Sequence, residues 1–222
     1  MRRSPSLRLL IGVAIAASAV FVALTVAVTT NPSVGIDSRA FDLANDLREP
    51  WLDHVVRVIT TLGLIVVVGP AVLLAAVLLL RHQHRARATA LVSGAALAWV
   101  TVWITKRVVD RPRPPGPLVH TGGQSYPSAH AANSVGWFAL ALAVTVLIPR
   151  RGIRTAAVAA GALLALLVGL SRIYLRAHYA TDVLGGEALA ISMYSLTAIA
   201  VLGWRSRRAS AGVPSPSAHA GQ

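Results

Sequence analysis

Six apolar runs, each close to the length of a membrane-spanning helix, alternate with polar segments along the chain. They occupy residues 9–29, 59–80, 88–105, 131–148, 155–171 and 183–204. Because a helix needs about 20 apolar residues to cross the hydrocarbon core of a bilayer, this pattern predicts six transmembrane helices. The expected fold class is therefore an all-α integral membrane bundle. The pair Gly69-Pro70 predicts a kink inside the second run.

The segments outside the apolar runs give further expectations. In the loop 31–58, the stretch 41–48 is expected to form a short interfacial helix, with Trp51 at headgroup level. The first run follows a basic start, as in a signal peptide, but it is long and lacks a clear cleavage site. We therefore expect an uncleaved signal-anchor helix. Residues 1–208 are expected to form one domain, and the Ser/Pro/Ala/Gly-rich tail 209–222 is expected to be disordered.

The composition agrees with a membrane protein and excludes cysteine chemistry. Hydrophobic residues make up 55% of the 222 positions and charged residues only 13%, which is unlike a disordered chain or an ordinary soluble domain. The chain has no cysteine, so disulfides, thiolate zinc sites and cysteine nucleophiles are excluded. The net charge of +13 by itself would allow a nucleic-acid-binding protein.

The placement of the charges explains the high net charge as a topology signal. With a cytoplasmic N-terminus, four cytoplasmic segments carry three arginines each and no acid, whereas all eight Asp and Glu lie on the other side. Those arginines are Arg2, Arg3, Arg8, Arg81, Arg85, Arg87, Arg150, Arg151, Arg154, Arg205, Arg207 and Arg208. We therefore expect a multi-pass cell-membrane protein with both termini cytoplasmic and no nucleic-acid partner. The polar segments 106–130 and 172–182 then share the outer face.

Cations gather in these two outer segments. Lys106 is the only lysine in the chain, and stiff proline-rich sequence follows it to Arg113. Arg172 ends the fifth apolar run. Taken singly, Lys106 is equally well read as an interfacial anchor, and Arg172 and His178 could likewise be anchors. Together the three cations could surround an anion, with help from Ser128, which is expected at or near the start of the fourth helix, and from the free backbone N–H groups of that start.

Two histidines and an aspartate complete a set suited to phosphoryl transfer. His178 and Asp182 are four residues apart, so a helical turn would place them on one face. An aspartate on one imidazole nitrogen fixes the tautomer and lets the other nitrogen attack. His130 remains available to protonate the leaving oxygen. Three cations suit the negative charge that a phosphoryl group in transfer spreads over its oxygens.

With these residues in place, the sequence resembles the type 2 phosphatidic acid phosphatase (PAP2) superfamily. The family pattern reads Lys-x6-Arg-Pro, Pro-Ser-Gly-His and Ser-Arg-x5-His-x3-Asp. The order and internal spacing match Lys106 to Arg113-Pro114, Pro127 to His130, and Ser171-Arg172 with His178 and Asp182. The motif region covers 106–182. One position departs from the pattern, because Ala129 stands where the family has glycine, and a position that needed positive φ would disfavour it.

The resemblance implies roles for these residues and an activity. His178 would form a phosphohistidine, His130 would act as general acid, and a water activated by His178 would release phosphate. Asp182 would orient His178. The phosphate ligands would be Lys106, Arg113, Ser128, Ala129 (through its backbone) and Arg172. The family needs no metal or other cofactor, and no acidic cluster suited to Mg²⁺ accompanies the motifs.

The expected partners are the bilayer and a membrane lipid phosphate. The outward-facing site favours polyprenyl (undecaprenyl) diphosphate, with phosphatidic acid or phosphatidylglycerol phosphate as alternatives. A phosphotransferase, in which another lipid or sugar replaces water, remains open, as does a non-catalytic protein that binds anionic lipid. The sequence does not determine the oligomeric state or assign a role to Arg176.

Overall fold

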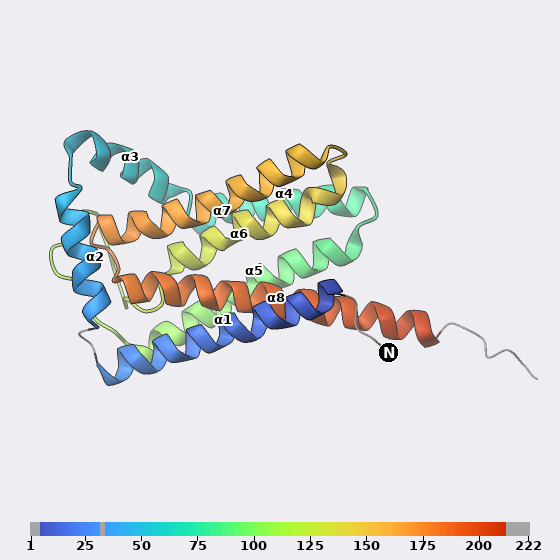
Figure 1. Ribbon diagram of the computed structural model, residues 1–222, viewed down its shortest axis with the longest axis horizontal. Coiled ribbons are helices and arrows are strands. Elements are labelled where there is room, and N and C mark those ends of the chain that lie inside the picture. Colours follow the sequence, from blue (N-terminus) through green and yellow to red (C-terminus); the bar gives the residue numbers. More distant parts are fainter. Residues whose placement is uncertain (1–4, 32–33, 212–222) are drawn as a thin grey trace, which may run out of the picture.

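A computed structural model describes residues 5–31 and 34–211, which form a bundle of long helices with one short helix, residues 35–46, across one end (Figure 1). The first four helices are α1 (Pro5–Thr30), α2 (Gly35–Asp46), α3 (Pro50–Thr61) and α4 (Ile65–Arg81). The others are α5 (Arg85–Val109), α6 (Ala129–Val144), α7 (Arg151–Tyr174) and α8 (Ala180–Ala211), with a 3₁₀ turn η1 (Thr145–Leu147) after α6. The all-α prediction is confirmed.

Among the described residues, five helices are long and apolar enough to cross a membrane, and the number is six when the bent pair of α3 and α4 is counted as one span. The chain bends by 47° between α3 and α4, at residues 62–64, a break that the sequence did not predict. Pro70, where a kink is predicted, lies inside α4. Side chains of α6 bind the carbonyl groups at this break: Trp137 Nε1 donates to Leu62 O (2.8 Å), and Asn133 Nδ2 donates to Gly63 O (3.2 Å). The break is therefore stabilised by tertiary hydrogen bonds that sequence does not reveal.

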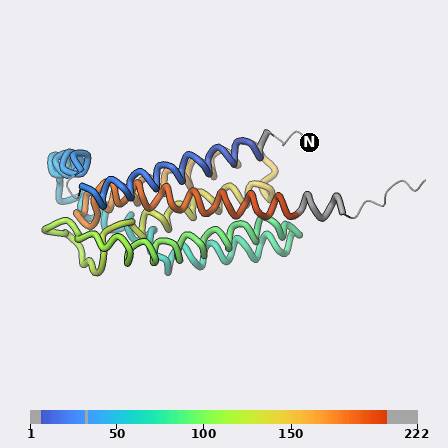
Figure 2. Tube along the Cα trace, turned by 90° about the horizontal axis from the view of Figure 1, so that it is seen from below, coloured from blue at the N-terminus to red at the C-terminus, as the bar shows by residue number. Residues whose placement is uncertain are grey.

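Helix α8 is the centre of the bundle and packs against α1, α5, α6 and α7. Figure 2 shows α1 and α8 running side by side along the molecule. Small residues allow close helix approach. A Cβ on Gly161 of α7 would lie 2.8 Å from the Trp137 carbonyl oxygen on α6. Many large apolar side chains remain exposed, including Leu9, Leu73 and Val108, as expected for surfaces that face lipid.

The N-terminal helix α1 is an integral part of this bundle. The ring of Phe21 stacks on Tyr126, with 6.3 Å between the ring centroids, and Thr25 Oγ1 lies 2.9 Å from the Tyr126 hydroxyl oxygen. Tyr126 belongs to the loop that precedes α6, so α1 supports a predicted site segment. These contacts connect α1 to the start of α6.

The two predicted site segments lie at the same end of the bundle, next to α2 and α3 (Figure 1). The short α4–α5 and η1–α7 turns lie at the opposite end, and they carry six of the predicted cytoplasmic arginines. The short helix expected at 41–48 exists as α2, shifted towards the N-terminus. Helix α8 continues to Ala211, and the rest of the predicted tail, 212–222, lies outside the described residues.

Candidate active site

His178 and Asp182 meet where the chain turns from α7 into α8. His178 lies before α8, and Asp182 lies in its first turn. Nδ1 of His178 is 3.4 Å from Oδ2 of Asp182, and the same carboxylate oxygen accepts a hydrogen bond from the Tyr179 amide (3.0 Å). The expected proximity is thus present, although the turn before α8 produces it rather than a continuous helix. His178 is only 2% exposed and Asp182 is fully buried.

The second imidazole nitrogen of His178 faces a cation. Nη1 of Arg113 lies 3.1 Å from Nε2 of His178. A guanidinium can only donate, so Nε2 must accept, and the ring proton must be on Nδ1, facing Asp182. Burial lowers the pKa of His178 to about 4, even though Asp182 opposes the shift. At neutral pH, His178 is therefore a neutral imidazole whose Nε2 lone pair points to the site.

Backbone carbonyl groups hold the two cations of the first motif. Arg113 donates to Gly122 O (2.8 Å), Gly123 O (3.0 Å) and Ala177 O (2.7 Å). Lys106, in the last turn of α5, donates to Gln124 O (2.7 Å). These bonds fix both side chains where the loop 110–128 folds back over the end of α5. The loop supplies two of the three carbonyl groups that bind Arg113, and Ala177, between α7 and α8, supplies the third.

Arg172 is the most deeply buried of the three cations among the predicted phosphate ligands. It lies in the last turn of α7, is 5% exposed, and donates from Nη1 to Thr60 Oγ1 of α3 (2.7 Å). Its Nε is buried and makes no hydrogen bond within the described residues. A buried donor without an acceptor is costly, and a phosphate oxygen would satisfy it. This geometry supports the predicted anion-binding role.

The second motif forms the start of α6, as predicted. Ser128 is the N-cap, and its Oγ accepts from the Ala131 amide (3.4 Å). Ser128 also donates its own amide to the Asp182 carbonyl oxygen (2.9 Å), which joins the starts of α6 and α8. Ala129 is the first helical residue and does not have positive φ, so the position does not demand glycine. His130 follows, within electrostatic range of Lys106, Arg113, Arg172 and His178.

The sequence interpretation missed three side chains that contact Asp182 directly or through Arg111. Arg111 donates to Asp182 Oδ1 (2.6 Å), and Ser125 donates its hydroxyl to Oδ2. Arg111 also pairs with Asp37 of α2 (2.8 Å). Arg111 stands within the first motif segment, but the motif specifies Arg113 and leaves position 111 open. Asp37 lies 145 positions before Asp182, and no sequence signal connects the two.

Arg176, which had no assigned role, occupies the turn after α7. Its φ is +51°, and its guanidinium lies over the Phe41 ring of α2, 5.2 Å from the ring centroid. It therefore contributes to the packing of α2 against the site loop. Within the described residues, no three His, Asp or Glu side chains come together in a way that could hold a metal ion.

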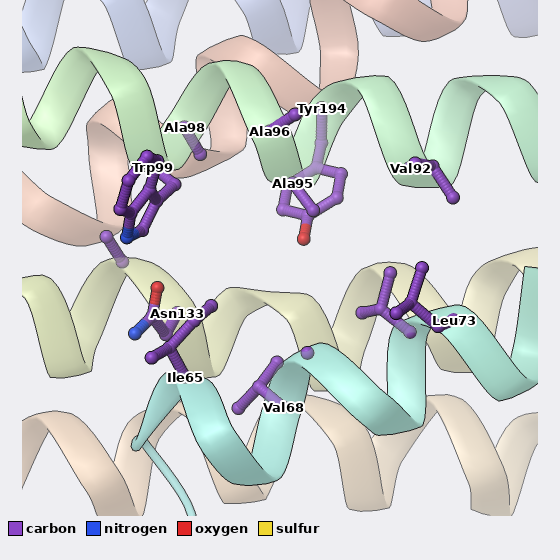
Figure 3. A pocket seen from close by; sticks show the side chains of 13 residues that line it. Ile65, Val68, Leu73, Val92, Ala95, Ala96, Ala98, Trp99, Asn133 and Tyr194 are labelled. Atoms are coloured by element: carbon purple, nitrogen blue, oxygen red, sulfur yellow. The ribbon is translucent and has the colours of Figure 1, made fainter.

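One cavity at the site adjoins a second cavity in the apolar part of the bundle. The first, about 240 Å³, is lined by Lys106, Ala129 and His130 together with apolar residues of α4 and α5. The second, about 280 Å³, lies between α4 and α5, as seen from close by in Figure 3. Ile65, Trp99 and Asn133 line both cavities. A polar site and an apolar groove are thus adjacent.

Comparisons with known proteins agree with this architecture. The family model of the PAP2 superfamily matches residues 87–208, a range that contains all eight predicted site residues. Phosphatidylglycerophosphatase B of Bacillus subtilis (strain 168) is 32% identical over 187 residues, which are 79% of this chain and 88% of that protein.

Two solved structures are also similar. One is the crystal structure of a transmembrane PAP2-type phosphatidylglycerolphosphate phosphatase from Bacillus subtilis, with a TM-score of 0.76 and 26% identity over 87% of this chain and 96% of that chain. The other is LpxE of Aquifex aeolicus, with a TM-score of 0.59 and 24% identity over 77% of this chain and 97% of that chain. The second likeness supports the fold alone.

Proposed function

Because the chain belongs to the PAP2 superfamily and is a membrane lipid-phosphate phosphatase, we propose that it hydrolyses its substrate through a phosphohistidine at His178. The observation that carries this proposal is the placement of the His178 ring. Nδ1 faces the Asp182 carboxylate at 3.4 Å, and Nε2 faces the anion-binding side of the site, where Arg113 lies at 3.1 Å. This is the arrangement that an attacking imidazole requires.

In the first half of the reaction, Nε2 of His178 attacks the phosphorus atom. The N–P bond forms while the P–O bond to the lipid breaks, and the electron pair goes to the lipid oxygen. His130 donates a proton to that oxygen. Asp182 stabilises the positive charge that develops on the imidazole through the Nδ1–H bond. Arg172 and Arg113 bind the phosphoryl oxygens, and Lys106 adds a third positive charge.

In the second half, water attacks the phosphohistidine. Once Nε2 of His178 carries the phosphoryl group, it has no lone pair with which to activate that water. His130, which is neutral after giving up its proton, takes the proton from the water instead. The N–P bond then breaks, inorganic phosphate leaves, and both histidines return to their starting states. His130 thus replaces His178 as the activating base that the sequence resemblance implied.

The apolar groove next to the site supports a lipid substrate. In Figure 3, Trp99 of α5 and Ile65 of α4 lie at one end of the groove, and Val92 and Leu73 lie at the other. If the headgroup of a lipid binds between Lys106 and His130, the lipid tail can extend into this groove. Such a tail would stay between α4 and α5, within the apolar part of the bundle, while its phosphate enters the polar site.

The relatives favour phosphatidylglycerol phosphate as the headgroup. Both the curated B. subtilis relative and the structure from B. subtilis are phosphatases named for this lipid. We therefore prefer phosphatidylglycerol phosphate to undecaprenyl diphosphate. The sequence favours undecaprenyl diphosphate only because the site is expected to face outward. Phosphatidic acid is the third candidate.

We also propose the predicted orientation, with both termini cytoplasmic and the site extracytoplasmic, because the six arginines of the α4–α5 and η1–α7 turns lie at the end opposite the site.

Phosphate release from the purified full-length protein in detergent with EDTA tests this proposal. The three lipids are assayed in parallel, with His178→Ala as the test variant and His120→Ala as the matched control in the exposed outer loop. We expect phosphatidylglycerol phosphate to react fastest and His178→Ala to lose roughly 10³-fold or more of the rate, as when a triad nucleophile is removed. The control should keep the wild-type rate.

The other outcomes each identify a different error. Equal release by wild type and His178→Ala means that the nucleophile is wrong, and inhibition by EDTA means that the reaction needs a metal. Faster phosphate release from undecaprenyl diphosphate means that this lipid is the preferred substrate, as the sequence alone predicts. If the protein binds these lipids but releases phosphate from none of them, it is the non-catalytic lipid-binding protein considered above.

A further inference from the structure

The carboxylate of Asp182 uses its two oxygens differently. Oδ2 faces His178, Ser125 and the Tyr179 amide, whereas Oδ1 accepts from Nη1 of Arg111 at 2.6 Å. Arg111 is 4% exposed, and its guanidinium lies over the Tyr179 ring, 4.1 Å from the centroid. A cation this close to Asp182 would by itself cancel most of the charge that His178 needs during attack.

Asp37 of α2 holds the other side of the same guanidinium. Nη2 of Arg111 lies 2.8 Å from Asp37 Oδ2, and Asp37 is also only 4% exposed. Thr181, next to Asp182, joins the two residues. Its amide donates to Asp37 Oδ1 (2.9 Å), and its hydroxyl oxygen accepts from Arg111 Nη1 (2.7 Å). Burial alone would lower the pKa of Arg111, but Asp182 and Asp37 outweigh that effect and raise it.

Asp37, Arg111 and Asp182 form a charge cluster whose net charge affects the attack of His178 on phosphorus. Two carboxylates share one guanidinium, so the cluster has a single net negative charge while His178 is neutral. That charge is available to stabilise the imidazolium that develops when His178 attacks. Without Asp37, Arg111 and Asp182 would form a neutral pair, and the stabilisation of His178 would be weaker. The forked geometry of arginine suits this role, because it reaches both carboxylates at once.

We propose that Asp37 is a positioning residue for the phosphatase reaction, acting through Arg111 to keep the Asp182 carboxylate oriented and charged towards His178. This inference rests on the proposed roles of His178 and Asp182. It gives α2 a function in catalysis, since this short helix across the end of the bundle supplies a buried charge to a site it does not line (Figure 1). Groups that orient the ligands of a catalytic metal act in a comparably indirect way, and their loss costs about 10–100-fold in metal affinity or activity.

A double-mutant cycle on the full-length protein tests whether Asp37 acts through Arg111. Asp37→Asn removes the charge but keeps an oxygen that can accept from Thr181. It is measured in the wild-type background and in an Arg111→Met background, with the lipid that wild type hydrolyses fastest as substrate. We expect Asp37→Asn to lower kcat by about 10–100-fold with little change in KM in the first background, and to have almost no effect in the second.

The controls separate this inference from the general mechanism and from misfolding. Asp42→Asn, on the exposed side of the same helix, should keep the wild-type kcat. If Arg111→Met does not fold, Arg111→Lys replaces it, because lysine keeps the charge but cannot bridge both carboxylates. His178→Ala is assayed alongside, and a wild-type rate for it would overturn the proposed function itself.

Three results would overturn the role of Asp37 alone while His178→Ala remains inactive. The first is a wild-type kcat for Asp37→Asn. The second is the same loss of kcat from Asp37→Asn in both backgrounds, which would mean that Asp37 does not act through Arg111. The third is a loss of kcat that only follows a lower melting temperature, which would mean that Asp37 merely stabilises the fold.

Discussion

Arg113 donates from Nη1 to Nε2 of His178 across 3.1 Å, so a predicted phosphate ligand covers the nitrogen that must attack phosphorus. The same Nη1 also donates to the Ala177 carbonyl at 2.7 Å. Attack therefore requires the guanidinium to exchange its contact with Nε2 for a phosphoryl oxygen. The carbonyl anchors on Gly122 and Gly123 can keep Arg113 at the site during this exchange.

Arg113→Lys is expected to lower kcat/KM by about 100-fold, comparable to the loss of one preorganised donor in other enzymes. A single ammonium cannot contact the carbonyl groups of Gly122 and Ala177 and a phosphoryl oxygen together. Phosphate release at several lipid concentrations measures this loss. The same change at Arg57, which is exposed on α3, is the control and should have no effect. A wild-type kcat/KM for Arg113→Lys would mean that Arg113 does not bind the phosphoryl group.

His178 is expected to stay neutral well below pH 6.5. Since burial lowers its pKa to about 4, the unfolded chain takes up this proton first as the pH falls. Above about pH 6.5, His178 is neutral in both the folded and the unfolded chain, and its protonation does not lower the free energy of unfolding. As the pH falls from about 6.5 towards about 4, protonation of the unfolded chain lowers the free energy of unfolding. NMR titration of protein labelled with ¹⁵N-histidine, with His178 assigned from a His178→Gln variant, should give a midpoint near 4. A midpoint at or above 6.5 would contradict the buried neutral imidazole.

Ala129→Gly is expected to leave activity equal or higher. Ala129 starts α6 without positive φ, so glycine offers no conformational gain, and removal of the methyl group only opens the cavity beside Lys106 and His130. Stability should fall slightly, by up to about 1 kcal/mol, because glycine is a poorer helix former. Phosphate release and thermal unfolding measure the two effects. A large loss of activity would show that the site is adapted to the methyl group.

Gly186→Ala is expected to damage both fold and activity. A Cβ at this position would clash with the Ser128 carbonyl oxygen and lie 3.3 Å from the Ala132 amide nitrogen, where α8 meets the start of α6. Overpacking against backbone typically costs about 1–3 kcal/mol and would displace Ser128 from Asp182. Thermal unfolding in detergent and phosphate release measure the two losses.

Gly203→Ala is the matched control on the same helix, where a Cβ would meet no described atom within 4 Å. It should be neutral or stabilise the protein by up to about 1 kcal/mol. Equal stability and activity of the two alanine variants would show that α8 and α6 can separate without harm to the site.

The apolar periodicity determined the all-α class, the spans and the end of the bundle at which the polar segments meet. It could do so because a bilayer requires long apolar helices, and their alternation fixes which loops share a side. The motif spacing also predicted the contact of His178 with Asp182 and the N-cap at Ser128, since both depend on residues close together in the chain. The break between α3 and α4 was not predictable, because Trp137 and Asn133 of α6 bind the carbonyl groups that it exposes.

Only the tertiary structure decided which charges surround the chemistry. The sequence marked Asp182 as the partner of His178 but gave no reason to connect it with Asp37, which reaches it through Arg111. It also predicted Arg113 as an anion ligand without indicating that this side chain rests on Nε2 of His178. Local spacing determines pairs within one turn, whereas buried charge networks arise from the docking of distant segments, here α2 against the start of α8.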